Sequence, residues 1–168
     1  MKKIKFLLSI CVLLVFTSCS PTQDEAISYN DGIMNIIDSL TLEHELLLDQ
    51  IDGHNIDSLK LTHKLFSERA RSSLERGKKI EAFADNRDFR NVALEYFTTM
   101  NYLADNEAKK MVEIMYKDSL QIPQSDVDEI NKLAASFDET YGKVYDKILT
   151  AQIKFADEWK FKLEESKK

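Results

Sequence analysis

The chain has 168 residues, with 23 Lys and Arg against 29 Asp and Glu, and a formal net charge of −6. An acidic chain repels phosphate backbones, so this composition argues against a role in binding nucleic acid. It also argues against electrostatic adhesion to an anionic lipid surface. The chain has four Gly and two Pro as helix breakers, which favours long helices, and its length suffices for a buried core.

The first nineteen residues have the order of a secretory signal peptide. Lys2, Lys3 and Lys5 give a basic start, an apolar stretch follows over 6–16, and small residues precede Cys19. The apolar stretch is far shorter than the ~20 residues that a membrane-spanning helix needs. We therefore expect residues 1–18 to be a cleavable signal peptide.

The four residues Phe16-Thr17-Ser18-Cys19 resemble the lipobox of bacterial lipoproteins. The resemblance implies that Cys19 receives a diacylglyceryl group, that the chain is cut before this cysteine, and that the new amine is acylated. Ser18 fits the position before the cut, whereas Phe16 departs from the usual aliphatic residue. Two or more acyl chains anchor a protein stably, so we expect membrane attachment through the N-terminal acyl chains. The alternatives are an ordinary signal peptide with a chance cysteine, or an uncleaved anchor.

Cleavage before Cys19 changes both the net charge and the thiol content. Removing the three lysines of the signal peptide leaves 20 basic against 29 acidic residues, a net charge of −9. Cys11 leaves with the signal peptide and Cys19 carries lipid, so no disulfide, nucleophilic thiol or cysteine metal site remains. Ser20 rather than Asp follows the cysteine, which resembles lipoproteins released to the outer membrane of Gram-negative cells. We expect a cell-envelope location at the outer membrane, on a face that the residues do not indicate.

Apolar residues that recur at spacings of three and four predict four amphipathic helices, over residues 22–52, 56–84, 88–119 and 125–161. Thr22 and Glu25 form a capping-box pattern for the first helix, and Ser125 with Asp128 forms a second capping-type start. The residues predicted to face the core are Ala26, Asn30, Ile33, Ile37, Leu40, His44, Leu47 and Ile51 in the first helix; Leu59, His63, Phe66, Ala70, Leu74, Gly77, Ile80 and Ala84 in the second; Phe89, Val92, Tyr96, Met100, Leu103, Glu107, Met111 and Ile114 in the third; and Val127, Ile130, Ala134, Phe137, Tyr141, Val144, Ile148, Ala151 and Phe155 in the fourth.

The connections between these helices are short. Gly53 suits the end of the first helix, Asp85 and Asn86 suit a tight turn, and Pro123 separates the last two helices. Short connections make sequential helices antiparallel neighbours, and stripes with a period near 3.5 pack nearly aligned. We predict an all-α chain, with an antiparallel up-down-up-down four-helix bundle preceded by a cleavable signal peptide. The expected organisation is a signal peptide at 1–18, a lipidated tether at 19–24 and the bundle at 25–168.

The pattern as a whole also resembles a known group of proteins. A lipobox, followed by Tyr29-Asn30-Asp31 near the start of an acidic helical body, resembles uncharacterised helical surface lipoproteins of Gram-negative bacteria. The resemblance implies a lipid-anchored helical domain, and it brings no catalytic residues with it.

Two histidines lie in the predicted core stripes. Folding the first two helices together at residues 53–54 sets His44 level with His63, and the next turn brings Glu107 to about the same level. Two imidazoles and a carboxylate suit a divalent transition metal or a proton-sensitive layer. The alternative is a structural polar layer, in which both imidazoles hydrogen-bond to Glu107, Ser136 or water. Both interpretations stay open here, and we expect no cofactor beyond the covalent lipid.

The sequence contains no recognised catalytic motif. Thr41 and Lys60 stand three residues before the two histidines, where a di-iron bundle needs Glu, and there is no Gly-rich phosphate loop. We therefore expect a non-enzymatic envelope lipoprotein that acts as a structural or interaction module for an unidentified protein partner. The alternative is a small-ligand or divalent-metal-binding bundle that uses the His44/His63 layer. Near the C-terminus, Trp159 with its neighbouring lysines suits either a membrane interface or a cap on the end of the bundle.

Overall fold

The computed structural model describes residues 21–53, 56–117 and 122–163. Every element of regular structure in these ranges is a helix, which confirms the predicted all-α class. The predicted signal peptide at 1–18 and the lipidation residue Cys19 lie outside the described residues. In chain order the elements are α2 (Gln23–Asp52), α3 (Ile56–Lys78), α4 (Asp88–Leu103), the π-helical segment η1 (Ala104–Ala108), α5 (Lys109–Lys117) and α6 (Gln124–Trp159).

The predicted capping box starts α2. The Thr22 hydroxyl accepts from the Glu25 backbone N–H at 3.2 Å, and the Glu25 carboxylate accepts from the Thr22 N–H at 2.7 Å. These two bonds satisfy amides that the first helical turn leaves without partners. All eight residues predicted to face the core from this helix are buried. The helix also takes in residues 23 and 24, the last two of the predicted tether, and ends at Gly53 as expected.

The second helix is shorter than predicted, because α3 ends at Lys78 and not at Ala84. Its last turn tightens, with the Lys79 and Ile80 N–H groups donating to carbonyls three residues earlier, and Arg90 Nε donates to the Ile80 carbonyl at 3.0 Å. This bond satisfies a carbonyl that a continuing helix would have used. The expected tight turn is present, since the Asn86 N–H donates to the Phe83 carbonyl at 3.0 Å. Ala84 in this turn has a left-handed φ of 52°.

The predicted continuous helix over 88–119 is interrupted by the π-helical segment η1 between α4 and α5. A π turn contains one more residue than an α turn, so it rotates the following residues around the helix axis. Ala104 and Ala108 are therefore fully buried, while Glu107, which the stripe placed in the core, is only partly buried. The end of α5 at Lys117 is the last residue described before the connection, so the predicted end at Ser119 lies outside the described part of the chain.

The start of α6 also differs from the prediction. Pro123 stands at the N-cap without a side-chain cap, and Asp128 accepts from the Gln124 side chain at 2.9 Å instead of pairing with Ser125. At the other end, Lys160 adopts a left-handed conformation with φ of 58°. The N–H groups of Lys160 and Phe161 donate to the carbonyls of Asp157 and Ala156, which is the Schellman arrangement that reverses a chain after a helix.

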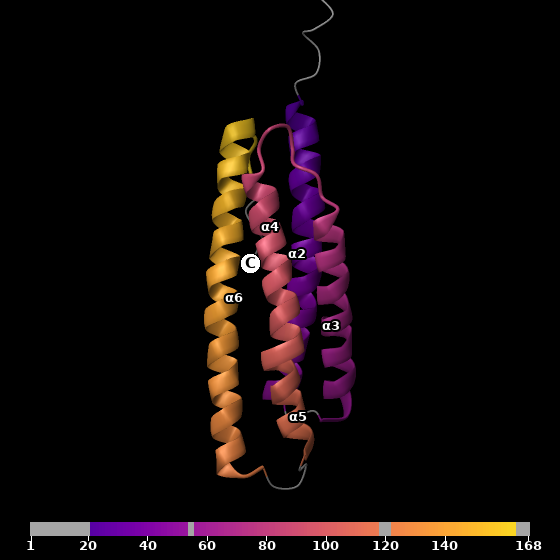
Figure 1. The fold of residues 1–168 in the computed structure, drawn as a ribbon, viewed down its shortest axis with the longest axis vertical. Coiled ribbons are helices and arrows are strands. Elements are labelled where there is room, and N and C mark those ends of the chain that lie inside the picture. The colour runs from indigo at the N-terminus through magenta and orange to yellow at the C-terminus, as the bar shows by residue number, and fades with distance from the viewer. Residues whose placement is uncertain (1–20, 54–55, 118–121, 164–168) are drawn as a thin grey trace, which may run out of the picture.

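The helices α2, α3, α4 and α6 lie side by side along the long axis of the molecule, and α5 continues the line of α4 (Figure 1). In the core, α2 packs on α3, α3 on α4, and α4 on α6. The start of α2 lies beside the end of α6, because the Gln23 side chain donates to the Lys160 carbonyl. The connection over residues 79–87 lies at this same end, where the Tyr29 hydroxyl donates to the Glu81 carbonyl at 2.8 Å.

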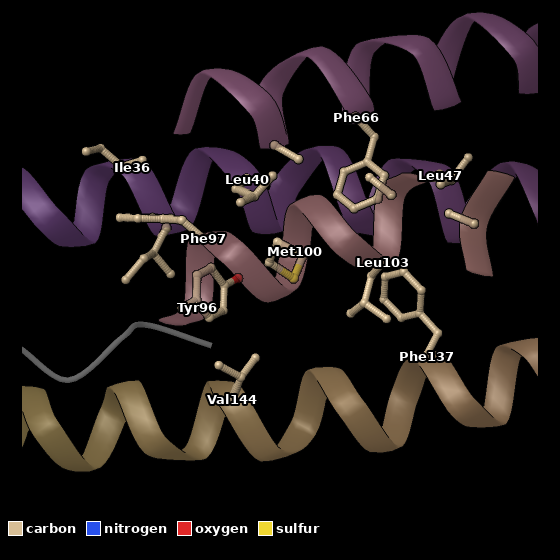
Figure 2. Packing of buried hydrophobic residues seen from close by; sticks show 14 of the residues in the cluster. Ile36, Leu40, Leu47, Phe66, Tyr96, Phe97, Met100, Leu103, Phe137 and Val144 are labelled. Atoms are coloured by element: carbon tan, nitrogen blue, oxygen red, sulfur yellow. The ribbon is translucent and has the colours of Figure 1, made fainter. Parts of the chain in front are cut away.

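Side chains from four helices form one hydrophobic core (Figure 2). Leu40, Phe66, Tyr96 and Phe137 are among its largest fully buried members, and each such burial contributes about 1.5–3 kcal/mol to folding. Gly77 allows α3 to approach Phe97 closely, since a Cβ at this glycine would lie 2.3 Å from the Phe97 ring. Three polar residues are buried among the described residues: Asn30, His44 and Ser73. Buried polar side chains of this kind are the starting points for the search for a functional site.

Candidate functional site

The imidazole of His44 is enclosed by aromatic rings in the middle of the core. The side chain is 3% exposed. The Phe137 ring stacks on it at a centroid distance of 4.7 Å, Tyr141 is tilted at 4.7 Å and Phe66 at 6.0 Å. Both ring nitrogens are buried without a hydrogen-bond partner among the described residues. The predicted hydrogen bonds from His44 to Glu107 or Ser136 are therefore not formed.

The surroundings of His44 keep it neutral. Burial lowers the pKa of its imidazole from 6.5 to about 4, because the charged form would lose its hydration. No carboxylate contributes to this shift, so nothing offsets the loss of solvent. At neutral pH the ring is an uncharged aromatic group that packs like its neighbours while leaving two polar atoms unpaired.

His63 has a different partner from the one predicted. Its Nε2 atom lies 2.9 Å from the carbonyl oxygen of Ala104, the first residue of η1. A carbonyl oxygen can only accept, so Nε2 carries the proton and donates. The Ser67 hydroxyl lies 3.3 Å from the same nitrogen. His63 is thus bound to the backbone at the π turn, where the regular helical hydrogen-bond pattern changes.

Glu107 does not join the two histidines. One of its carboxylate oxygens accepts from the Ser136 hydroxyl at 3.5 Å, and the other is buried without a partner in the described ranges. The predicted metal set of His44, His63 and Glu107 is not assembled, and no group of three or more His, Cys, Asp or Glu among the described residues could hold a metal ion. The physical reason is that aromatic rings enclose His44, a backbone carbonyl engages His63, and the π turn sets the position of Glu107.

A tyrosine cluster lies close to this layer and was not predicted. The Tyr96 hydroxyl is 3.1 Å from the Thr41 hydroxyl, and the Tyr141 phenol lies close enough to both residues for each to lower its pKa. Burial raises the pKa of Tyr96 and of Tyr141, so both phenols stay protonated. Tyr96 and Tyr141 belong to the predicted stripes, but Thr41 does not, and only the packing of α2 against two other helices brings the three hydroxyls together.

A groove of about 750 Å³ follows the boundary between α2 and α6. Asn30 lies in its wall, and the side-chain oxygen of this residue is buried without a partner while its nitrogen donates to Asp31 at 3.0 Å. Phe161 and Leu163, which follow the Schellman turn, also line the groove. Sequence analysis placed Asn30 in the core stripe, but the groove depends on how the two helices separate and could not be found from spacing.

Trp159 packs on the end of the bundle. Its ring meets Phe83 edge to face at 4.9 Å and lies 6.4 Å from Phe155. The indole nitrogen is buried and has no hydrogen-bond partner in the part of the chain that is described. Of the two interpretations of this residue, the contacts favour a cap on the end of the core.

Comparisons with models of known families, with curated proteins and with solved structures gave no match to this chain. Within the described ranges, no helix has the length and apolar character needed to cross a membrane.

Proposed function

We propose that this protein is a lipid-anchored lipoprotein of the cell envelope, located at the outer membrane, and that its helical domain is a non-enzymatic interaction module. The anchor is the lipidated Cys19 that remains after residues 1–18 are removed. The domain is an antiparallel up-down-up-down four-helix bundle. Its partner in this proposal is a protein that contacts the exposed face of α2 and α3.

The position of the α2 capping box supports attachment close to a membrane. The N-cap Thr22 follows Cys19 by three residues, which span about 10 Å when extended. The connection from α3 to α4 lies at the end of the molecule where α2 starts and α6 ends (Figure 1), and the contact of Gln23 with Lys160 agrees with this. Both observations support the alternating direction of the helices. An anchored bundle of this kind holds one end near the lipid and directs the other away.

The engagement of the histidines supports a non-catalytic role. A general base must bring a ring nitrogen within hydrogen-bond reach of a substrate. The nitrogens of His44 are closed off by aromatic rings, and Nε2 of His63 donates to a backbone carbonyl. Among the described residues, neither histidine lines the groove between α2 and α6.

The observation that carries the interaction role is a set of exposed leucines on α2 and α3. Leu42 and Leu46 are 57% and 43% exposed, and Leu61 and Leu65 are 59% and 44% exposed. Each pair has a spacing of four residues, which places its members on one side of their helix. Because α2 and α3 pack on each other, we infer that these four leucines form one exposed apolar surface, the kind of surface that commonly marks a site of protein association.

Metabolic labelling with radioactive palmitate tests the anchor. We expect the wild type to be labelled and to remain in the membrane fraction, whereas Cys19→Ala loses both properties because the acceptor thiol is gone. Cys11→Ala is the matched control, since it removes a thiol from the predicted signal peptide and should keep the label. Label retained by Cys19→Ala would reject the lipid anchor.

A photo-crosslinking residue placed at Leu42 or Leu65 tests the interaction role in intact cells. We expect an adduct of one defined mass from both positions and none from Lys132, an exposed residue of α6. The double substitution Leu46→Glu/Leu61→Glu should abolish the adduct, because a buried carboxylate is costly at an apolar contact. Equal adducts from Lys132 would show that the leucine surface has no special role.

A second candidate function is the binding of a small ligand in the groove between α2 and α6. The observation that favours it is the unpartnered side-chain oxygen of Asn30 in the wall of this groove. Such an atom is costly to bury, and a ligand with a hydrogen-bond donor would satisfy it. Asn30→Leu should abolish ligand-induced thermal stabilisation in a screen of amine and amide compounds, while Asn35→Leu serves as the control on the same wall.

A further inference from the structure

Among the described residues, basic side chains gather at the end of the bundle where α2 begins. Four basic residues line a pocket of about 510 Å³ between the end of α3 and the start of α4: Lys78, Lys79, Arg87 and Arg90. Glu81 is the one carboxylate in this lining. The local charge is therefore opposite in sign to the formal net charge of −6 for the whole chain.

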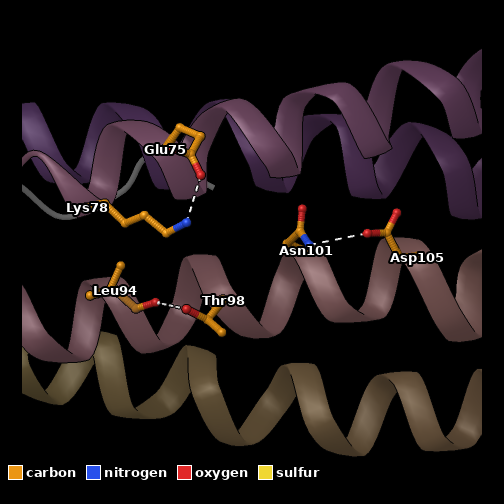
Figure 3. A network of polar contacts seen from close by, with 6 residues as sticks. All are labelled: Glu75, Lys78, Leu94, Thr98, Asn101 and Asp105. Atoms are coloured by element: carbon orange, nitrogen blue, oxygen red, sulfur yellow. Dashed lines mark hydrogen bonds and ion pairs between the residues drawn. The ribbon is translucent and has the colours of Figure 1, made fainter.

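Two of the four basic residues are already held by other groups. Lys78 pairs with Glu75 at 2.7 Å, as Figure 3 shows. Arg90 is half-buried, and it donates from Nε to the Ile80 carbonyl at 3.0 Å and from Nη1 to Asn91 at 3.1 Å. These bonds fix the guanidinium of Arg90 against the connection. A fixed guanidinium is prearranged for a tetrahedral anion, since less conformational entropy is lost on binding.

The other two basic residues are free to meet a ligand. Lys79 and Arg87 are exposed, and neither forms an ion pair with any residue that the structure describes. Arg87 is also the N-cap of α4 and provides no side-chain cap to this helix. The Asn86 side-chain oxygen accepts from the Asp88 N–H at 2.9 Å, and the Asp88 carboxylate is in the first turn of α4, so the helix N-terminus is already partly neutralised. The positive charge of the pocket therefore comes from its basic side chains. Asp88, in the first turn of α4, lines a different groove together with Phe155.

The pocket lies on the end of the molecule that the proposed anchor would hold against a membrane. The connection over 79–87 and the start of α2 share this end (Figure 1), and Tyr29 of α2 bonds to the Glu81 carbonyl. We propose that this basic pocket binds a phosphoryl group. The group would belong to a phosphorylated lipid headgroup or to free phosphate, and the lipid source rests on the proposed anchoring at Cys19.

The matching of charge and geometry supports this ligand class. Arg and Lys donate charge-assisted hydrogen bonds to phosphate oxygens, and each basic side chain near an anionic surface strengthens attraction about fivefold. The sequence-wide charge argues against adhesion to anionic lipid, but it averages over a molecule whose ends differ. The basic pocket can therefore attract an anion even though the whole chain has a negative net charge.

The test compares the wild-type full chain with Lys79→Ala/Arg87→Ala. Both substitutions remove exposed charges without removing a hydrogen bond that supports the fold, and circular dichroism checks that helix content is kept. The matched control is Lys110→Ala/Lys132→Ala, which removes the same charge from exposed positions on α5 and α6. Vesicle binding is measured on phosphatidylcholine alone and on phosphatidylcholine mixed with phosphatidylglycerol. Because residues 1–20 are the same in all three proteins, a difference between them in the ratio of the two affinities reports on the substituted residues.

We expect the pocket variant to lose about 25-fold of the preference for anionic vesicles, at about fivefold for each side chain. The control variant should keep this preference. In a second arm, inorganic phosphate should shift the backbone amide resonances of residues 78–91 relative to chloride at equal ionic strength, and the pocket variant should lose these shifts. Shifts with phosphate but no difference on vesicles would support the phosphoryl site and assign it to free phosphate.

The proposal is overturned if the pocket variant keeps both the vesicle preference and the phosphate shifts. It is also overturned if the control variant loses as much, because the effect would then be one of total charge. Palmitate labelling at Cys19 is independent of both arms. A failure of the anchor is therefore distinguishable from a failure of the pocket.

Discussion

Two aromatic clusters lie at different levels of the core. We define the Phe155 cluster as Tyr29, Phe83, Phe89, Phe155 and Trp159, and the His44 layer as His44, Phe66, Phe137 and Tyr141. Fourteen residues of α6 separate Phe155 from Tyr141, a rise of about 21 Å. Both clusters bury rings at comparable distances, so their apolar contributions are similar in kind.

The difference between the clusters is in their polar atoms. Among the described residues, the Phe155 cluster leaves one ring nitrogen buried without a partner, on Trp159, and the His44 layer leaves two, both on His44. The indole nitrogen already carries its hydrogen and does not titrate, whereas the imidazole can take up a proton. Similar packing therefore leaves the rings of the Phe155 cluster insensitive to acid, whereas acid can protonate His44 and destabilise the fold there.

Breaking the Phe155 cluster should have the largest effect. Phe155 is fully buried and contacts rings from α2, from the 79–87 connection and from α4. We expect Phe155→Ala to lower the free energy of unfolding by about 3–5 kcal/mol, measured in urea, because it removes apolar burial and leaves a cavity. Ile153→Ala is the control, since this side chain is 53% exposed and should change stability by less than about 0.5 kcal/mol.

Lowering the pH should destabilise the protein through the His44 layer and not through the Phe155 cluster. The pKa of His44 is lowered to about 4 in the folded chain and lies near 6.5 when unfolded, so the unfolded state binds a proton first. The stabilisation by neutral His44 is complete above pH ~6.5 and is lost as pH falls towards ~4, by about 3 kcal/mol in total.

The variant His44→Phe keeps a ring in this position and removes the titration. Urea unfolding at a series of pH values should show wild type losing this amount relative to the variant over that range. Parallel curves for the two proteins would contradict the assignment of an acid-sensitive group to His44. His63→Phe provides the comparison with a histidine that is not enclosed in the layer.

A smaller effect is expected where His63 supports the π turn. Replacing it by Phe leaves the Ala104 carbonyl without the donor that lies 2.9 Å away. The expected loss is about 1–2 kcal/mol in the free energy of unfolding, because Ala104 is fully buried and its acceptor stays dry. Ser67→Ala removes only the longer contact, and hydrogen exchange of the η1 amides should be faster in the first variant alone.

The smallest change in stability should come from a substitution at Ala84. This residue lies in the connection over 79–87, next to Phe83 of the Phe155 cluster. A left-handed φ of 52° is strained for alanine and free for glycine. Ala84→Gly should raise stability by about 0.5 kcal/mol, after the added entropy of the unfolded chain is taken into account. Ala82→Gly lacks the strain and should lower stability, so an increase in both thermal midpoints would contradict this explanation.

The helical periodicity of α2 could be predicted from the sequence because its information is local. The capping box fixes where the helix begins, and a regular spacing then determines which residues face inward. Local spacing does not predict where α3 ends. The spacing of Ala84 fits the core stripe of this helix, yet Ala84 lies outside the helix and is exposed. The chain leaves the helix at Lys78, where tertiary contacts of Arg90 and Phe83 outweigh one more turn of helix.

The candidate site was less predictable, because it depends on rotation about helix axes. The spacing of apolar residues along α2 was enough to predict that His44 is buried. Its partners were not predictable, since one extra residue in η1 moves Glu107 partly out of the core and brings a backbone carbonyl to His63. The groove between α2 and α6 and the basic pocket at 78–91 combine residues from separate elements, which no spacing along the chain encodes.

The Schellman turn at Lys160 has a practical consequence for work with this protein. The helix α6 ends at Trp159, but the turn sends Phe161 and Leu163 back into the wall of the groove. Leu163 therefore lies in the same wall as Asp31 and Asp38, and not beyond the open end of the helix. A spectroscopic label meant to report on the groove therefore belongs at Lys162, whereas a label meant to leave the groove clear belongs at Gly53.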